Sequence, residues 1–426
     1  MSRKTIFIIA LIIILLLGGL FGALFFVSKD LGEPVGETLK TFLPFGLGGE
    51  DVSFPERNNG ENDVGEFPSG SDIQGEGDSA PENNIETVIS KTGVLRQLSV
   101  VPTAGIFTST DSVGTTEVSY VERQTGHIYT VPTDGRAKNR ISNTTIPGIR
   151  EVAWGNIKNT LIIRYLDDND VIKSFFGIIT ETGQGPDGTL EGTFLSNDIQ
   201  TIAASPGKIR KFTLLPFGNS LIGTISDFDD KNKKEVFNSS FTEWTASWPE
   251  ENTISLATKP SGNAEGFLYF LNLKTLNLQK VVGGVNGLTA LTSPEATRVL
   301  YSQAEKNGFT THLYNVPKKT SSMFLLTTLP EKCAWSKIAS EIIYCAVPEI
   351  IPQGTYPDNW YQGVLSFSDT IWKVNVENGI PDILARPREL TGQGIDLIDP
   401  VLTENEEYLI FRNKKDSTLW SLKIAD

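Results

Sequence analysis

The sequence contains two cysteines, Cys333 and Cys345, with a predicted turn at residues 338–340 between them. Folding the chain about this turn places the two residues roughly opposite each other on neighbouring antiparallel strands, where the Cβ separation suits a disulfide. Such a pair oxidises outside the cytoplasm. We therefore expect a disulfide there; the alternative is two independent buried thiols. A zinc site is not expected, because two cysteines without suitably placed histidines do not complete a ligand set.

The two histidines, His127 and His312, occupy one slot of a repeat, because each comes directly before an aliphatic residue and a tyrosine. A slot that recurs through a repeat is set by the repeat itself, so we interpret both histidines as structural or surface residues. The sequence also has no Gly-x-Ser-x-Gly elbow, the motif that presents a hydrolase nucleophile. We therefore predict no catalytic residue.

Two acidic turns, residues 167–170 and 227–232, carry carboxylates that could bind calcium outside the cell. Lys231 interrupts the second turn at a place where a further ligand would be needed. Asp and Asn are also the residues that hairpin turns favour through their backbone geometry alone. We therefore predict no metal site and no cofactor.

A long insertion at residues 347–368 carries Tyr356, Trp360 and Tyr361 among several prolines. Long loops on a rigid scaffold often bind ligands, and aromatic side chains held by proline present contact area at a low entropic cost. These three residues are our candidate binding site. The alternative is that the loop packs down and caps its own part of the domain.

Seven short apolar strands carry an aliphatic or aromatic residue followed by an aromatic one, and they indicate a repeat architecture. They contain Ile128-Tyr129, Phe175-Phe176, Val236-Phe237, Leu268-Tyr269, Leu313-Tyr314, Ile371-Trp372 and Leu419-Trp420. Another apolar run and a turn precede each pair, as in Leu221–Ile225 before the third one, which predicts hairpins. Arg140–Ser142 and Arg388–Thr391 suggest a fourth, outer strand. The sequence therefore predicts an all-β, seven-bladed β-propeller.

The last unit lacks an outer strand of its own before the sequence ends. Residues Arg96–Ser99 match Arg388–Thr391 and precede the first unit. We therefore expect residues 94–99 to form the outer strand of the last blade. This closure matters because an unpaired strand would leave an exposed sheet edge.

The units resemble the TolB-type, WD40-like propeller repeat. The best matches are Trp335-Ser336 with Ile342–Tyr344, and Asp399-Pro400 with Tyr408–Phe411. The resemblance covers about residues 94–426 and departs from the family pattern in lacking a clean Pro-Asp-Gly turn. It implies the propeller fold and the binding of proteins, peptides or glycans, with occasional catalysis, but one fold serves many functions.

The N-terminal part of the chain differs from the repeats. Residues 6–27 are uncharged and almost wholly apolar, and as a helix they are long enough to cross a bilayer. Arg3 and Lys4 precede this segment, which places the N-terminus in the cytoplasm. We predict an uncleaved single-pass anchor in the cell membrane; the alternative is a signal peptide that is removed.

These features divide the chain into a cytoplasmic stub (1–5), a transmembrane helix (6–27), a disordered acidic linker (28–88) and the propeller domain (89–426) outside the cytoplasm. The linker is expected to be disordered because it is polar and carries one sign of charge. The formal net charge of −14 argues against a nucleic-acid partner.

The organisation predicts a binding or scaffolding protein that engages an envelope or extracellular protein, peptide or glycan through the propeller loops. One alternative is an extracytoplasmic hydrolase or lyase with carboxylates at the propeller channel, which predicts acidic side chains converging at one mouth of that channel. Another is a structural component of the envelope.

Overall fold

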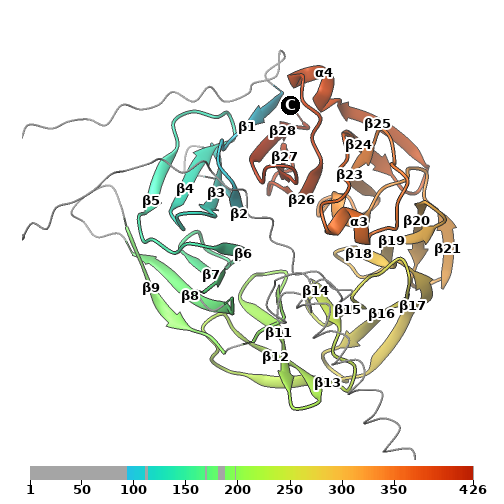
Figure 1. The fold of residues 1–426 in the computed structure, drawn as a ribbon, viewed down its shortest axis with the longest axis horizontal. Helices are drawn as coiled ribbons and strands as arrows, with labels where there is room; N and C mark the ends of the chain where they lie inside the picture. The colour runs from blue at the N-terminus through green and yellow to red at the C-terminus, as the bar shows by residue number, and fades with distance from the viewer. Residues whose placement is uncertain (1–93, 111–113, 168–169, 181–187, 197, 426) are drawn as a thin grey trace, which may run out of the picture. The chain divides into compact units, whose positions relative to one another are not determined.

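The computed structural model describes residues 94–425, apart from 111–113, 168–169, 181–187 and 197. Within these residues the strands form seven four-stranded sheets, which lie around a common axis like the blades of a propeller (Figure 1). The predicted all-β, seven-bladed propeller is confirmed. The predicted membrane helix at 6–27 and the linker at 28–88 lie outside the described residues. No helix that the structure describes is long and apolar enough to cross a membrane.

Each blade uses four strands in chain order, from the axis outwards, except the last. Blades 1 to 3 consist of β2 (Thr103–Thr110), β3 (Thr116–Glu122), β4 (Ile128–Pro132) and β5 (Asn139–Ser142); β6 (Ile149–Trp154), β7 (Thr160–Leu166), β8 (Ile172–Thr180) and β9 (Thr189–Phe194); and β10 (Thr201–Ala204), β11 (Arg210–Phe217), β12 (Ser220–Asp227) and β13 (Lys234–Ser239). Blades 4 to 6 consist of β14 (Trp244–Glu250), β15 (Thr253–Thr258), β16 (Glu265–Asn272) and β17 (Leu278–Asn286); β18 (Thr289–Thr292), β19 (Arg298–Glu305), β20 (Gly308–Asn315) and β21 (Thr320–Met323); and β22 (Cys333–Trp335), β23 (Ile342–Pro348), β24 (Asp369–Asn375) and β25 (Ile380–Ala385). Blade 7 combines β26 (Leu397–Leu402), β27 (Tyr408–Asn413) and β28 (Leu419–Lys423) with β1 (Leu95–Gln97), and the connections contain the short helices η1 (Pro330–Lys332), α3 (Asp358–Tyr361) and α4 (Pro387–Thr391).

The second strand of a blade is apolar on both sides because a neighbouring blade covers each of its faces. Leu161, Ile162 and Ile163 of β7 are all fully buried. Leu161 and Ile163 belong to the core between blades 1 and 2, whereas Ile162 belongs to the core between blades 2 and 3. Successive side chains of a strand point to opposite faces. The continuous apolar runs in the sequence are therefore strands packed on two sides.

The ring closes where β1 joins the last blade, which Figure 1 shows as the blue strand beside the red C-terminal strands. β1 pairs with β28 in the antiparallel register Leu95↔Leu422, Arg96↔Ser421 and Gln97↔Trp420. Leu98 N continues the pairing by donating to Leu419 O at 2.7 Å. The predicted closure by residues 94–99 is therefore confirmed.

Blade 3 departs from the sequence prediction by one strand. Leu221–Ile225 lies on the third strand, β12, and Val236-Phe237 on the outer strand, β13, while β11 is the second strand. The third strand carries Gly223 in place of an aromatic residue. A Cβ at Gly223 would lie 2.6 Å from Phe212 Cζ and 2.8 Å from Phe237 Cβ, so rings from both neighbouring strands already fill this space.

The outer strand of blade 6 was also assigned wrongly. Residues Arg388–Thr391 form most of the short helix α4, and the outer strand is β25. Pro387 stands at the start of this helix and Gly392 at its end with a φ of 78°. Proline is favoured at the first helical position and glycine in the left-handed conformation just past the end. These two flanking residues are the local signals for the helix.

We predict that the ring depends on the side chain of Leu95. Leu95 is fully buried in the core between blades 6 and 7, so Leu95→Ala is expected to lower the free energy of unfolding by about 2–5 kcal/mol. Urea denaturation of the purified protein measures this change. The exposed Leu278 on β17 provides the control, and Leu278→Ala is expected to change stability by less than about 0.5 kcal/mol. Equal effects of the two substitutions would contradict a closing role for β1.

Candidate functional site

The two ends of the ring differ in the connections that they carry. Because strands alternate in direction along each blade, the connections between second and third strands lie at the same end as those between successive blades. We call this end the loop face. The insertion at 347–368 joins β23 to β24, so it lies on the loop face of blade 6, and α3 forms its middle.

The insertion reaches beyond its own blade. The Asp358 carboxylate accepts hydrogen bonds from Ser261 Oγ at 3.0 Å and from Gly262 N at 2.6 Å, both in the second hairpin connection of blade 4. A Cβ at Gly262 would lie 2.6 Å from Tyr356 O, so this close approach requires glycine. The loop is therefore held at both its own blade and a more distant one.

The three predicted binding residues differ in their exposure to solvent. Tyr356 is 1% exposed and Trp360 is 2% exposed, whereas Tyr361 is 44% exposed. Both buried rings stack on Phe367, with centroids 6.0 Å away for Tyr356 and 6.1 Å away for Trp360. Tyr356 and Trp360 thus act as the loop's own core, as the capping alternative describes, and only Tyr361 presents its ring to solvent. Binding by this loop stays a prediction.

A buried ion cluster lies beneath these rings. Lys332 Nζ contacts Asp396 Oδ1 at 2.5 Å and Asp369 Oδ2 at 2.8 Å, and all three side chains are fully buried. Asp396 also accepts hydrogen bonds from Trp360 Nε1 at 3.0 Å and from Phe367 N at 2.9 Å. One carboxylate therefore ties the inner end of blade 7 to both the lysine and the insertion.

The cluster brings together residues from three parts of the chain that are distant in sequence. Lys332 ends η1, the connection into blade 6; Asp369 begins β24; and Asp396 directly precedes β26. Sequence reasoning missed all three residues, because no spacing pattern relates them. The one local signal was a lysine directly before the apolar strand Cys333–Trp335.

The cluster carries one more negative than positive charge when every group is ionised. Burial raises the pKa of Asp369 to about 6. The nearby Asp396 carboxylate raises this pKa further, whereas the attraction of Lys332 lowers it. Asp369 Oδ1 is buried without a hydrogen-bond partner among the described residues. The second acceptor, Oδ2, also receives Leu397 N at 2.7 Å. A proton on Asp369 would therefore make the cluster neutral.

The enzyme alternative predicts carboxylates that converge at a channel mouth. Asp369 and Asp396 do converge, but they do so on a lysine and with no exposure to solvent. Three of their four oxygens accept hydrogen bonds from the fold itself, so the arrangement positions the loop. Outside the cluster, the insertion exposes Ile350 and Val364. A pocket of about 210 Å³ is lined by Ile350, Phe367 and Arg388 among others.

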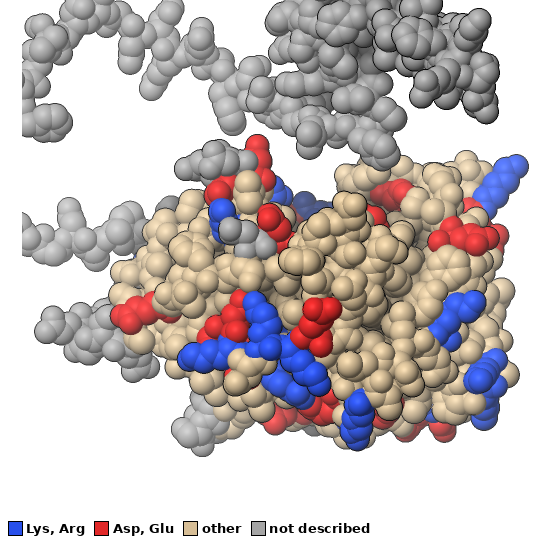
Figure 2. All heavy atoms as spheres, turned by 90° about the horizontal axis from the view of Figure 1, so that it is seen from below, with Lys and Arg blue, Asp and Glu red and all other residues tan. Residues whose placement is uncertain are grey.

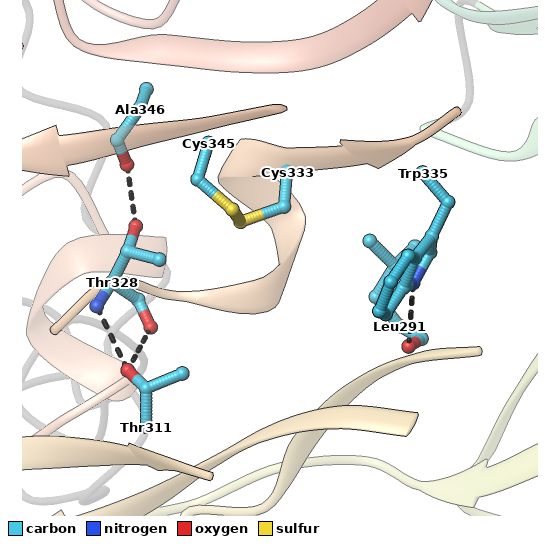
Figure 3. The surroundings of a disulfide bond; sticks show 7 residues. All are labelled: Leu291, Thr311, Thr328, Cys333, Trp335, Cys345 and Ala346. Carbon is cyan, nitrogen blue, oxygen red and sulfur yellow. Dashed lines mark hydrogen bonds between the residues drawn. A yellow bond between two sulfur atoms is a disulfide. The ribbon is translucent and has the colours of Figure 1, made fainter. Parts of the chain in front are cut away.

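The first cysteine follows the buried lysine directly in the chain, and both cysteines lie in the core between blades 5 and 6. β22 and β23 pair Cys333 with Cys345 in register, and a disulfide joins them (Figure 3). Beside the bond, Thr328 N donates to Thr311 Oγ1 at 2.8 Å, and Thr328 Oγ1 donates to Ala346 O. Because Lys332 immediately precedes Cys333, the covalent bond fixes the backbone that carries the buried lysine.

The other candidates from the sequence lie elsewhere. His312 stacks on Tyr301 with ring centroids 5.1 Å apart, and His127 Nε2 lies 3.4 Å from Thr145 Oγ1. In the acidic turn at 227–232, the buried Lys211 Nζ lies 2.6 Å from Asp230 Oδ1. The edge of the ring seen in Figure 2 shows such basic and acidic side chains interspersed. Among the described residues, no group of three metal-ligating side chains comes together.

The sequence matches no protein-family profile, and no curated protein matches it. An oligogalacturonate lyase from Vibrio parahaemolyticus is similar in structure, with a TM-score of 0.54 and 9% identity over 80% of this chain and 97% of that one. TolB from Acinetobacter baumannii gives a TM-score of 0.41 and 12% identity over 62% of each chain. The β-propeller domain of the Trilobed protease from Pyrococcus furiosus gives 0.47 and 11% over 74% of this chain and 95% of that one. At these identities the similarity concerns the fold alone, and at that level the predicted resemblance to TolB-type, WD40-like propellers is confirmed.

We predict opposite consequences for the two buried carboxylates. Asp369→Asn mimics the protonated residue. Because the raised pKa makes the folded protein bind more protons than the unfolded chain between about pH 4 and pH 6, wild-type stability falls as the pH rises through this window. The free energy of unfolding of the variant, relative to that of the wild type, should therefore be about 2 kcal/mol higher at pH 7 than at pH 4. Urea denaturation at both pH values measures the difference.

Asp396→Asn is the matched comparison. An asparagine offers one acceptor where the lysine, the indole and a backbone amide now donate to two. We expect this substitution to lower the free energy of unfolding by about 1–3 kcal/mol at both pH values, because buried donors lose their partner. A pH-independent difference between wild type and Asp369→Asn would contradict the assigned protonation.

Proposed function

We propose that the protein is a membrane-anchored, extracytoplasmic β-propeller that acts as a binding or scaffolding module and engages a partner protein through the loop face of blade 6. The observation that carries this proposal is the exposure of apolar side chains on a loop that is fixed from below. Ile350 is 77% exposed, and Val364 and Tyr361 accompany it. Loops on rigid scaffolds commonly bind, and a preformed surface avoids the cost of ordering on association.

The chemistry of this surface favours a protein or peptide over a glycan as the partner. Aliphatic side chains such as Ile350 and Val364 gain free energy by leaving water against another apolar surface, whereas the hydroxyl groups of a glycan require polar partners. Tyr361 at the edge of the loop joins an apolar ring to a hydroxyl that bonds Glu331. Aromatic residues of this kind are frequent at protein interfaces.

The placement of the domain rests on the N-terminal sequence. We propose that residues 6–27 anchor the protein in the cell membrane, that residues 1–5 stay in the cytoplasm, and that residues 28–88 tether the propeller outside. The apolar length and the preceding Arg3 and Lys4 support this orientation. The disulfide supports an oxidising compartment.

An extracytoplasmic lyase or hydrolase is a second candidate. The structural similarity to an oligogalacturonate lyase and two carboxylates that line a pocket near the axis, Glu151 and Asp399, favour it. Each carboxylate is paired with an arginine, however: Arg164 Nη1 lies 2.5 Å from Glu151 Oε2, and Arg412 Nε donates to Asp399 Oδ2 at 2.9 Å. Each of these carboxylates is therefore already engaged by a guanidinium group of the fold itself.

The binding proposal predicts a loss of capture when the apolar surface is made acidic. Full-length protein carrying Ile350→Asp and Val364→Asp is expected to recover its protein partner from envelope extracts at least tenfold less than wild type does, because both side chains would have to bury a charge. Quantitative mass spectrometry of cross-linked complexes measures the recovery.

The opposite end of the ring provides the matched control. Ile338 is 68% exposed there, in the connection between the first and second strands of blade 6, and Ile209 is exposed in the equivalent connection of blade 3. Ile338→Asp with Ile209→Asp is expected to leave recovery unchanged. Equal recovery by all three proteins would remove the loop from the proposal, and specific retention on glycan-coated beads would replace the protein partner with a glycan.

The placement predicts the redox state of the cysteines in the cell. When thiols are blocked during lysis without prior reduction, we expect mass spectrometry to find Cys333 and Cys345 joined and unlabelled. Reduction before blocking should label both. Free, labelled thiols in the unreduced sample would argue against a location outside the cytoplasm.

A further inference from the structure

A second pocket lies at the axis, away from the blade 6 insertion. It has a volume of about 360 Å³ and lies among the innermost strands β2, β6 and β26, which belong to three adjacent blades. Its walls include Ile106, Arg150, Val152 and Val401, together with Arg412 of β27. Pockets of this size commonly hold small molecules.

All three innermost strands are irregular at the pocket. The pairing register shifts between Ala104 and Phe107 in β2, between Ile149 and Glu151 in β6, and between Ile398 and Val401 in β26. Bulges of this kind re-aim side chains and are frequent next to functional sites. Asp399, inside the third bulge, has a φ of 51°. A non-glycine residue in this region is held there by its surroundings and is often associated with function.

Gly105 lines the pocket where β2 packs closely against β6. Its φ is 65°, and a Cβ there would lie 2.7 Å from Val152 Cβ and 2.9 Å from Trp154 Nε1. Trp154 is buried, and its Nε1 has no hydrogen-bond partner among the described residues. An unpaired buried N–H is unusual in a native protein. The glycine therefore lets β2 approach Val152 and the indole of Trp154 more closely than any other residue would allow.

Both carboxylates at the pocket are paired with an arginine, but not every arginine there is paired with a carboxylate. Asp399 accepts from Arg412, and Glu151 pairs with Arg164. Arg150 is exposed at the pocket wall and has no acidic partner among the residues that the structure describes.

A further guanidinium lies next to these. Arg123 donates to Ile149 O at 3.0 Å and to Ser417 Oγ at 3.4 Å, again without a described carboxylate. Burial, and then the charges of Arg412 and Arg150, lower the pKa of Arg123. Two guanidinium groups at this end of the axis thus remain uncompensated.

We propose that this pocket binds a small organic anion, whose carboxylate is held by Arg150 in the positive field of Arg123. Guanidinium groups match the planar carboxylate with two parallel hydrogen bonds. The apolar side chains of Ile106, Val152 and Val401 line the remaining wall, so the ligand has a carbon skeleton and is not inorganic phosphate. This site is separate from the apolar surface of the insertion and does not depend on the proposed protein partner.

The test is isothermal titration calorimetry of the full-length protein with succinate, citrate and glucuronate as probes. We expect at least one of the three to bind, with an affinity that falls as the salt concentration rises, because ions screen the attraction. Arg150→Gln should weaken binding at least tenfold. Arg136→Gln, on an exposed outer connection of blade 1, should leave it unchanged, and the neutral succinamide should not bind.

Three outcomes would overturn the proposal. These are no binding by any of the three carboxylates, equal binding to wild type and Arg150→Gln, and binding of inorganic phosphate as tightly as of the organic acids. Arg150 is exposed, so the variant is expected to fold, and an unchanged melting temperature establishes that a loss of affinity reflects the lost guanidinium. Thermal denaturation with and without the bound probe provides an independent measure, because a ligand of the folded state raises its stability.

Discussion

The pairing of β1 with β28 is the constraint on which the rest of the structure depends. Blade 7 takes only three strands from the C-terminal part of the chain and receives its fourth from residues Leu95–Gln97. Without that strand, β28 would expose a row of unpaired backbone groups, and the core between blades 6 and 7 would lose Leu95. Both surfaces to which we assign binding involve connections or strands of blades 6 and 7. Both sites therefore belong to a ring that this pairing closes.

The ion cluster beneath the insertion fixes the conformation of that loop more than it stabilises the fold. Removing Lys332 and two carboxylates from water is costly, and an apolar replacement of the same shape is often at least as stable. The cluster instead specifies one arrangement: the same Asp396 carboxylate binds the lysine of η1, the indole of α3 and a backbone amide near β24. An apolar core tolerates several packings of a loop, whereas these donors fit one. The exposed residues of the insertion are thereby presented on a fixed base.

The sequence predicted those features that depend on periodicity and missed those that depend on contacts across blades. The recurring apolar strands with pairs such as Ile128-Tyr129 indicated the seven blades, and the match of Arg96–Ser99 to an outer strand located the closing segment. Gly223 broke the pattern in blade 3, because two phenylalanines from neighbouring strands occupy its space. Trp360 was predicted as part of a candidate binding site, with a packed-down loop as the alternative, because nothing near it in sequence indicates that Asp396 would accept its N–H. Lys332, Arg150 and the three bulges were invisible for the same reason.

The segment that begins blade 7 contributes to both the ion cluster and the axial pocket. Asp396 and Asp399 are three positions apart, yet one is fully buried against Lys332 and the other lines the axial pocket with Arg412. A regular strand would place residues 397, 399 and 401 on one face and 398 and 400 on the other. The bulge between Ile398 and Val401 breaks this alternation, so Leu397 stays in the core while Asp399 turns to the pocket. The cluster holds the start of β26 in place, and the bulge turns the next residues of the strand towards the axis. The pocket therefore has a wall whose position is set by contacts under the neighbouring loop.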